Sequence, residues 1–243
     1  MPEGPSIVIM QEEMQAFSGK KILEASGTAN IDMNKLLNRK VVAIKTWGKH
    51  FLICLPHLTL RIHLLLFGKY SIDEPRKGKP KLQLRFTNGT LYFYACSVTE
   101  IEEDLDDVYD WTTDLMNKQW DPAAARKRLR SHPDMLLCDA LLNQDIFAGA
   151  GNIFKNEILF RTRLHPLNTV GAIPTSKQAA IVREMHTYAF EFLRWKKAGV
   201  LKKHWEAHTK KICPRCGIPF HKEYLGKTKR RTFFCESCQI RYA

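Results

Sequence analysis

The chain has 243 residues, of which 44% are hydrophobic and 26% are charged, so it can bury a core of ordinary size. It contains no run of about 18 apolar residues and no basic–apolar–small pattern at its start, so we expect neither a transmembrane helix nor secretion. The net charge of +13 comes entirely from one half: residues 1–120 hold 15 basic and 15 acidic side chains, whereas residues 121–243 hold 23 and 10. This asymmetry favours a polyanionic partner for the second half. Nucleic acid fits better than a membrane because no basic amphipathic helix stands out.

The first half has the pattern of one helix followed by short strands. Apolar residues recur every three or four positions from Ile7 to Phe17, which predicts a helix over residues 3–17. Strand patterns follow at residues 21–25, 41–47, 51–55, 58–64, 82–86 and 90–95. Asn88 and Gly89 form a two-residue hairpin signal. Short strands at this spacing predict an antiparallel β-sandwich or barrel.

An acidic stretch separates this region from a helical one. Residues 100–114 hold eight carboxylates, which suit a solvated linker better than a metal cage, and we place a domain boundary there. Helices are predicted at residues 122–130, 135–143, 153–160 and 176–197. The expected fold is therefore α+β and multidomain. Residues 1–114 form a helix and an antiparallel sandwich, residues 115–211 a helical module, and residues 212–243 a cysteine-rich hairpin.

Pro2 and Glu3 are the first candidates for chemistry. A small proline after Met1 favours removal of the methionine, which leaves the secondary amine of Pro2 as the N-terminus. An α-amino group titrates near pH ~7.7–8.0, so part of it is uncharged at neutral pH and can attack C1′ of a deoxyribose to form a Schiff base. Glu3 is adjacent and can serve as an acid or base. The alternative is that both residues merely begin a helix.

The cysteines give the strongest local signal. Two CxxC pairs, separated by eighteen residues, match a tetrahedral site in which zinc has four thiolate ligands. The ligands are Cys213, Cys216, Cys235 and Cys238. All four positions are filled by the protein, which indicates structural zinc, and the segment between the pairs has the pattern of a β-hairpin. A redox-active CxxC is the alternative, but it needs only one pair. The other three cysteines, scattered in apolar surroundings, are typical of a reducing compartment.

Several turns have side chains suited to DNA. The cysteine hairpin carries a basic cluster at residues 227–231, including Arg230, which can contact phosphates or simply aid solubility. A glycine-rich turn at residues 149–152 opens a helix, where backbone N–H groups can approach a phosphate. Lys49 lies in a turn between two strands. The apolar residues that follow the fourth predicted strand form either buried core or a wedge that enters a base stack; they are Leu65, Leu66 and Phe67.

Together these motifs resemble the formamidopyrimidine-DNA glycosylase/endonuclease VIII (Fpg/Nei) family, nearly end to end and in the family's order. The start, PEGP at residues 2–5, is similar to the endonuclease VIII branch, and Lys49 matches the lysine between two N-domain strands. Asn152 lies in a GxGNxxxxE motif typical of the helix–two-turns–helix module. Arg230 and the closing CxxCQ motif at residues 235–239 match the family's zinc finger.

The resemblance implies a bifunctional DNA glycosylase/AP lyase of base excision repair, a monomer that acts on damaged duplex or single-stranded DNA and not on membranes. The Pro2 amine displaces a flipped-out base, Glu3 transfers a proton at the sugar, and β- and δ-elimination cut the strand. Lys49, Asn152 and Arg230 hold the surrounding phosphates. Structural Zn²⁺ is the implied cofactor. The implied location is the cytoplasm and nucleoid in a bacterium, or the nucleus in a eukaryote. The alternative is a non-catalytic zinc-ribbon protein that binds damaged DNA.

Three features favour the endonuclease VIII branch and oxidised pyrimidines as the better substrates. Residues 65–67 are closer to that branch's Gln-Leu-Tyr than to the Gly-Met-Ser of Fpg. Residues 95–98 lack the Arg-Phe pair of Fpg, and the segment before the first cysteine pair is short for a loop that caps oxidised purines. Two residues depart from the family pattern: Ser6 stands where both branches usually have Glu, and Leu65 replaces a polar residue.

Overall fold

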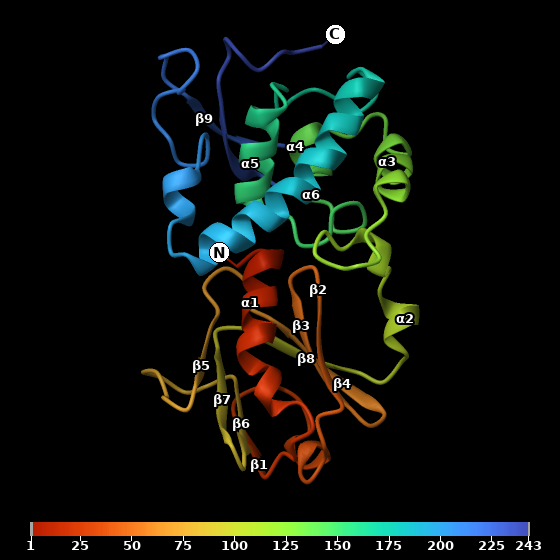
Figure 1. The fold of residues 1–243 in the computed structure, drawn as a ribbon, viewed down its shortest axis with the longest axis vertical. Helices are drawn as coiled ribbons and strands as arrows, with labels where there is room; N and C mark the ends of the chain where they lie inside the picture. Colours follow the sequence, from red (N-terminus) through yellow and green to blue (C-terminus); the bar gives the residue numbers. More distant parts are fainter. Residues whose placement is uncertain (1, 243) are drawn as a thin grey trace. The chain divides into compact units, whose positions relative to one another are not determined.

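The computed structural model describes residues 2–242 and divides into two compact units, Met1–Asp110 and Trp111–Ala243 (Figure 1). The domain boundaries expected after residues 114 and 211 stay predictions. Among the described helices, none is long and apolar enough to cross a lipid bilayer.

The N-terminal unit contains two four-stranded antiparallel sheets and one long helix (Figure 1). The strand order is β1-β6-β7-β5 in one sheet and β2-β3-β4-β8 in the other. The strands are β1 (Glu24–Ser26), β2 (Ala43–Trp47), β3 (His50–Leu55), β4 (Leu58–His63), β5 (Lys69–Ile72), β6 (Leu82–Phe86), β7 (Gly89–Tyr94) and β8 (Ser97–Ile101). The helices are α1 (Gly4–Met14), with 3-10 turns at Gln15–Phe17 and Met33–Leu36, and α2 (Leu105–Val108). The expected helix and antiparallel sandwich are confirmed.

Helix α1 is held by its apolar face. Ile7, Met10 and Met14 are completely buried in the core that both sheets share. The Gln11 side chain donates a hydrogen bond to the carbonyl of Ile44 at 2.8 Å, which ties α1 to β2. Burial of one such apolar side chain stabilises the fold by about 1.5–3 kcal/mol. The residues just before α1 are therefore attached to a firmly packed helix.

The strands differ from their predicted positions at a few places. Strands β5 and β8 are not in the predicted set, and β1 lies nearer residue 26 than expected. The hairpin signalled by Asn88 and Gly89 exists, but its loop residues are Thr87 and Asn88, since Gly89 already pairs with Phe86. Strand β8 mixes polar and apolar residues over only five positions, which is why its pattern is weak.

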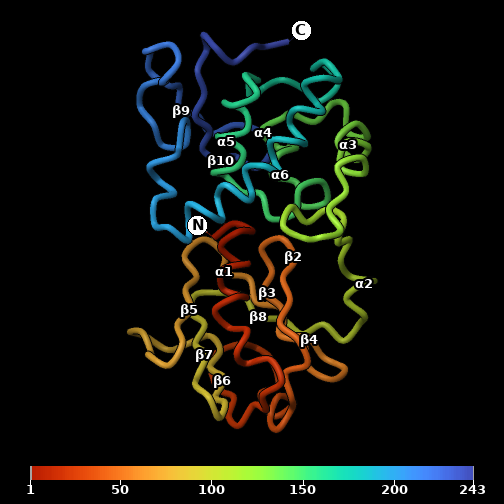
Figure 2. Tube along the Cα trace, in the orientation of Figure 1, coloured from red at the N-terminus to blue at the C-terminus, as the bar shows by residue number. Residues whose placement is uncertain are grey.

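The C-terminal unit is helical and ends in a two-stranded hairpin. Its helices are α3 (Pro122–Arg130), α4 (Leu137–Ala140), α5 (Asn152–Arg161) and α6 (Thr175–Lys197), with 3-10 turns at Trp111–Thr113 and Leu201–His204. Its strands are β9 (His221–Leu225) and β10 (Arg230–Phe234). Phe154 of α5 packs against Tyr188 and Phe192 of α6, with ring centroids 5.0 and 5.7 Å apart. Figure 2 shows β10 passing beside α5, which it contacts.

Helix α4 is shorter than the helix predicted over residues 135–143. Leu136 is extended, and the backbone N–H of Leu137 donates to the carbonyl of Asn168 at 2.8 Å. At the other end, the Asn143 side chain accepts a hydrogen bond from the N–H of Asp145, a local turn that competes with the helix. Hydrogen bonds outside the helix thus replace its expected first and last turns.

Candidate functional site

The predicted site residues of the N-terminal unit lie at one end of it. The pairing of Trp47 with His50 makes Gly48 and Lys49 a two-residue turn, and His50 also pairs with His63. The loop at residues 65–67, which follows β4, therefore lies at the same end of the sheet as Lys49. The N-terminal end of α1 lies at this end too (Figure 1). Pro2, Glu3, Lys49 and the apolar loop therefore lie at the same end of the N-terminal unit.

Pro2 and Glu3 lie just outside α1. Glu3 is the residue before the first turn, has an extended backbone with φ −125° and ψ 170°, and is completely buried. Its carbonyl accepts the N–H of Ser6 at 2.8 Å, and Pro5 fits the first turn. A carboxylate at a helix N-terminus is favoured by the partial positive charge of the helix dipole. Pro2 is half-buried. Glu3 is therefore fixed in place immediately beside Pro2.

The Lys49 turn rests on a cluster of aromatic side chains. Gly48 is buried with φ +53°, a left-handed conformation that glycine adopts without strain. The Nδ1 atom of His50 lies 3.1 Å from the Tyr109 hydroxyl, and the Trp47 ring lies 4.9 Å from the Tyr109 ring. Burial, helped by the neighbouring charges, lowers the pKa of His50 to about 4. His50 is therefore neutral at pH 7.

The loop at residues 65–67 presents three apolar side chains to solvent. Leu65, Leu66 and Phe67 are 50%, 45% and 77% exposed. The loop is a tight turn, because the N–H of Gly68 donates to the carbonyl of Leu64 at 2.7 Å. A Cβ atom at Gly68 would lie 2.1 Å from that carbonyl oxygen, so only glycine fits. Of the two interpretations of this stretch, buried core is excluded, whereas the base-stack wedge stays a prediction.

In the C-terminal unit, the structure brings Asn152 and Arg230 together. Asn152 is the first residue of α5, and its Nδ2 donates to the carbonyl of Arg231 at 2.9 Å. The completely buried Lys155 ammonium donates to Thr232 Oγ1 at 2.7 Å and to the carbonyls of Arg230 and Arg231 at 3.3 Å. The backbone that carries Arg230 is therefore fixed directly to the helix that carries Asn152.

The buried carboxylate of Glu157, the buried amide of Asn156 and the half-buried carboxylate of Asp139 complete this network. Asn156 accepts the N–H of Phe233 at 3.0 Å and donates to the Asn152 carbonyl. Glu157 accepts three backbone N–H groups, from residues 206 to 208, at 2.7–3.0 Å; its burial raises its pKa, which these bonds oppose. At the hairpin tip, Asp139 of α4 accepts the N–H groups of Lys227 and Thr228. The hairpin is thus attached to two helices and not loosely appended.

The four cysteines of the hairpin form a compact group. Their Sγ atoms all lie within 4.8 Å of one another, and those of Cys213 and Cys238 are 3.8 Å apart. A tetrahedral zinc ion with Zn–S bonds of about 2.3 Å separates its sulfur ligands by about 3.8 Å. Gln239 supports the second cysteine pair: its Oε1 accepts the N–H of Cys235, and its Nε2 donates to the Leu164 carbonyl, both at 2.8 Å. The donor set and spacing fit structural zinc.

Sequence reasoning missed Lys155, Asn156 and Asp139 as members of the site. The first two lie within a helix in which every residue from 152 to 160 is buried. A lysine and an asparagine within such an apolar segment are a signal in themselves, because a buried charge or amide requires hydrogen-bond partners. Asp139 gives no comparable signal, since its partners are backbone groups almost 90 residues away.

Comparison with known proteins identifies the class to which this fold and site belong. The family model for the formamidopyrimidine-DNA glycosylase N-terminal domain matches residues 1–97, and that for its H2TH domain matches residues 112–202. The fold is that of a DNA glycosylase: it resembles Lactococcus lactis formamidopyrimidine-DNA glycosylase, solved non-covalently bound to AP-site DNA, with a TM-score of 0.84 at 22% identity over 98% of this chain and 99% of that one. The chain belongs to the Fpg/Nei family.

The curated relatives differ in how much of their length the chain covers. It is 27% identical to endonuclease 8-like 3 of Xenopus laevis over 233 residues, which is 90% of this chain but 38% of that protein. It is also 27% identical to probable endonuclease 8 2 of Streptomyces coelicolor, over 98% of this chain and 94% of that one. The chain thus spans about two fifths of the animal relative and nearly all of the bacterial one.

Proposed function

We propose that this chain is a bifunctional DNA glycosylase/AP lyase of base excision repair. The observation that carries the proposal is the grouping of Pro2, Glu3, Lys49 and the apolar loop at one end of the N-terminal unit. That end offers a nucleophile, a proton-transfer group, a cation for phosphate and an apolar wedge. The similarity to proteins named endonuclease 8-like and formamidopyrimidine-DNA glycosylase supports the same reaction class.

Once Met1 is removed, the Pro2 nitrogen attacks C1′ as the bond from C1′ to the damaged base breaks, and the base leaves with a proton. The C1′–O4′ bond then opens, Glu3 supplies the proton that O4′ takes, and the Pro2 nitrogen forms an iminium with C1′. Loss of a C2′ proton expels the 3′ phosphate by β-elimination. A second elimination expels the 5′ phosphate, and water releases the sugar fragment from Pro2.

The C-terminal unit contributes phosphate contacts in this proposal. Lys49, Asn152 and Arg230 hold the backbone around the flipped nucleotide, and the basic hairpin adds contacts that do not read sequence. The attachment of β10 to α5 through Lys155 supports this role, because it holds the Arg230 backbone and Asn152 in a fixed relation. Damaged DNA is the proposed partner and a monomer the proposed state.

Zinc is the proposed structural metal. Cys213, Cys216, Cys235 and Cys238 would hold it, and its role is to fold the hairpin that carries Arg230. The core around the cysteines is small: among the described residues, its further buried members are Phe160, Ala207 and Phe220. A module with so small a core usually requires a bound metal ion or disulfide bonds to fold stably.

Reductive trapping tests the reaction. Protein that begins at Pro2 is incubated with DNA containing an abasic site and with borohydride, and a covalent adduct on the N-terminal peptide is expected. Protein with an extra residue before Pro2 has an amide in place of the amine and should give none. Pro56→Gly is the control and should still form the adduct. Pro56 lies in the exposed turn between β3 and β4, at the end of that sheet opposite to Lys49.

Two outcomes contradict this proposal. Adduct formation by the extended protein would assign the nucleophile to another amine, such as Lys49. The absence of any adduct from correctly processed protein that still binds the DNA would indicate a non-catalytic DNA-binding protein.

Oxidised pyrimidines are the proposed better substrates. Support comes from residues 65–67, from the absence of an Arg-Phe pair at residues 95–98, and from the short segment between α6 and Cys213. Excision of thymine glycol and 8-oxoguanine is compared in matched duplexes under single-turnover conditions. A faster rate for thymine glycol is expected, and a clear preference for 8-oxoguanine would overturn the assignment.

A further inference from the structure

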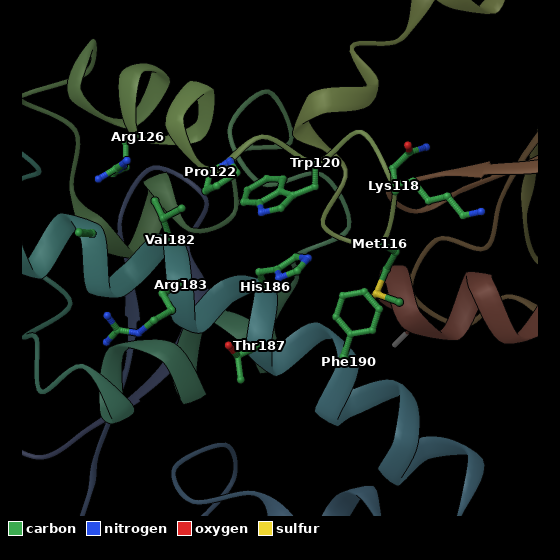
Figure 3. Close-up of a pocket in the computed structure, with 12 residues that line it drawn as sticks. Met116, Lys118, Trp120, Pro122, Arg126, Val182, Arg183, His186, Thr187 and Phe190 are labelled. Carbon is green, nitrogen blue, oxygen red and sulfur yellow. The ribbon is translucent and has the colours of Figure 1, made fainter.

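A cavity in the C-terminal unit has no part in the proposed reaction. It has a volume of about 770 Å³ and lies between the segment at residues 116–122, the beginning of α3 and one face of α6 (Figure 3). Residues 179–190 of α6 line it at three- and four-residue spacing, so a single stripe of that helix forms its wall. Its volume falls within the range of pockets that hold small molecules, about 300–1,000 Å³.

One wall of this cavity is aromatic. The Trp120 and His186 rings are nearly parallel, 6° apart, with centroids separated by 6.0 Å. The Phe190 ring meets His186 edge-on at 5.0 Å and is 47% exposed (Figure 3). Burial lowers the pKa of His186, so this imidazole is uncharged at neutral pH and acts as part of the aromatic surface.

The remainder of the cavity is positively charged. Lys118, Arg126 and Arg183 line it, and none of the described lining residues is acidic. Between residues 2 and 242, Lys118 and Arg126 form no salt bridge. Arg183 approaches only Glu184, at 3.8 Å, and its side chain is 70% exposed, so this pair neutralises it weakly. The cavity therefore offers an aromatic wall beside positive charge that is at most weakly neutralised.

We propose that this cavity binds a nucleotide, with the base against Trp120, His186 and Phe190 and the phosphate held by Lys118, Arg126 and Arg183. Nucleobases stack on aromatic side chains whatever their sequence, and a stacked base contributes about 1–3 kcal/mol. Arginine and lysine supply the charge-assisted hydrogen bonds that a phosphate requires. A free nucleotide and a nucleotide within single-stranded DNA share this chemistry. The proposal does not depend on the reaction at Pro2, because none of the groups used there lines the cavity.

Binding measurements on the full-length protein test the proposal. Titration calorimetry is carried out with deoxyadenosine monophosphate, with deoxyadenosine and with inorganic phosphate, and the nucleotide should bind more tightly than either part. Phe190→Ser should weaken nucleotide binding about tenfold by removing a stacking surface. Arg126→Glu should weaken it by about tenfold or more. Lys127→Glu is the matched control, since Lys127 is an exposed neighbour on α3 outside the cavity, and it should leave affinity unchanged.

A second arm distinguishes the source of the nucleotide. A single-stranded oligonucleotide with a photoreactive terminal base should crosslink to the peptide containing Trp120 or to α6, and Phe190→Ser should abolish that crosslink. Crosslinking without measurable binding of the free nucleotide assigns the cavity to strand ends, whereas binding of the mononucleotide alone assigns it to free nucleotides. Borohydride trapping of the same variants reports separately on Pro2.

Three results overturn the proposal. One is equal binding of the nucleotide and of inorganic phosphate, and another is an equal loss of affinity in Arg126→Glu and Lys127→Glu. The third is binding of a short acidic peptide that Phe190→Ser weakens while nucleotide binding is absent, which would assign the cavity to an acidic protein partner.

Discussion

The two units present their candidate residues in different ways. In the N-terminal unit, Lys49 and residues 65–67 lie on short turns, and their side chains are half-buried or exposed. In the C-terminal unit, Asn152 is almost fully buried, and Arg230 lies on a strand whose backbone is bonded to the buried Lys155. A turn can change its side chains at little cost to the fold, whereas a buried polar network cannot. Substitutions should therefore separate function from stability in the first unit and couple them in the second.

Removal of the hairpin metal should cause the largest loss of structure and of DNA affinity, and this loss should arise in the C-terminal unit. Cys238→Ser, or zinc chelation, should disorder β9 and β10 and lower DNA affinity about tenfold or more, because the hairpin holds Arg230 and much of the positive charge. Hydrogen exchange of the hairpin amides, zinc content and DNA binding are measured together. Cys96→Ser, at a buried thiol of the N-terminal unit, should leave zinc content and hairpin protection unchanged. Normal hairpin protection in metal-free protein would contradict the proposal.

Lys155→Met should cause the next largest loss. Methionine keeps the length of the side chain but removes the ammonium that donates to the Thr232 hydroxyl, and with it one of the donors to the carbonyls of Arg230 and Arg231. The expected cost is about 2–4 kcal/mol of unfolding free energy in the C-terminal unit, accompanied by weaker DNA binding. Urea unfolding measures it. Lys196→Met, at the exposed end of α6, is the control and should change stability by less than about 0.5 kcal/mol. Equal effects of the two substitutions would show that Lys155 does not couple α5 to β10.

A fall in pH from 7 to 5 should lower the stability of both units. Burial is the main cause that lowers the pKa of His50, in the first unit, and of His208, in the second, to about 4, from an ordinary value of 6.5. Each imidazole is neutral in the fold, so the unfolded chain binds its proton first and stability is lost as pH falls from 6.5 towards 4. The loss between pH 7 and pH 5 should be about 2 kcal/mol per group. His50→Gln should remove its share of this dependence, whereas His132→Gln, at an exposed site, should not. An unchanged pH dependence in His50→Gln would mean that His50 is protonated in the fold.

The contrast between local signals and long-range contacts explains how much of the molecule could be predicted from the sequence. The spacing of Ile7, Met10 and Met14 predicts α1, and the turn residues predict the Lys49 hairpin, because both signals are local. The CxxC pairs predict the cysteine cluster, since the two cysteines of each pair are close along the chain. The contacts of Lys155 and Asp139 could not be predicted, because their partners lie more than 70 residues away. The exposure of residues 65–67 was undecided, since an apolar run fits buried strand and exposed loop equally.

Leu65 gives the smallest and most selective prediction. Its φ of +50° is left-handed, a conformation that costs a residue with a Cβ atom roughly 1–2 kcal/mol, so Leu65→Gly should stabilise the N-terminal unit by about 0.5 kcal/mol once the entropy of glycine is included. Loss of an apolar wedge side chain should nevertheless slow excision from duplex DNA several-fold. His57→Gly is the matched control: His57 has φ +58° in the exposed turn at the opposite end of the same sheet, and its replacement should stabilise the unit without slowing excision. Thermal unfolding and single-turnover excision are measured on both variants. If Leu65→Gly is as active as the unmodified chain, the strained loop does not act as a wedge at this position. If it is slower yet more stable, the strain at Leu65 serves function at the expense of the fold.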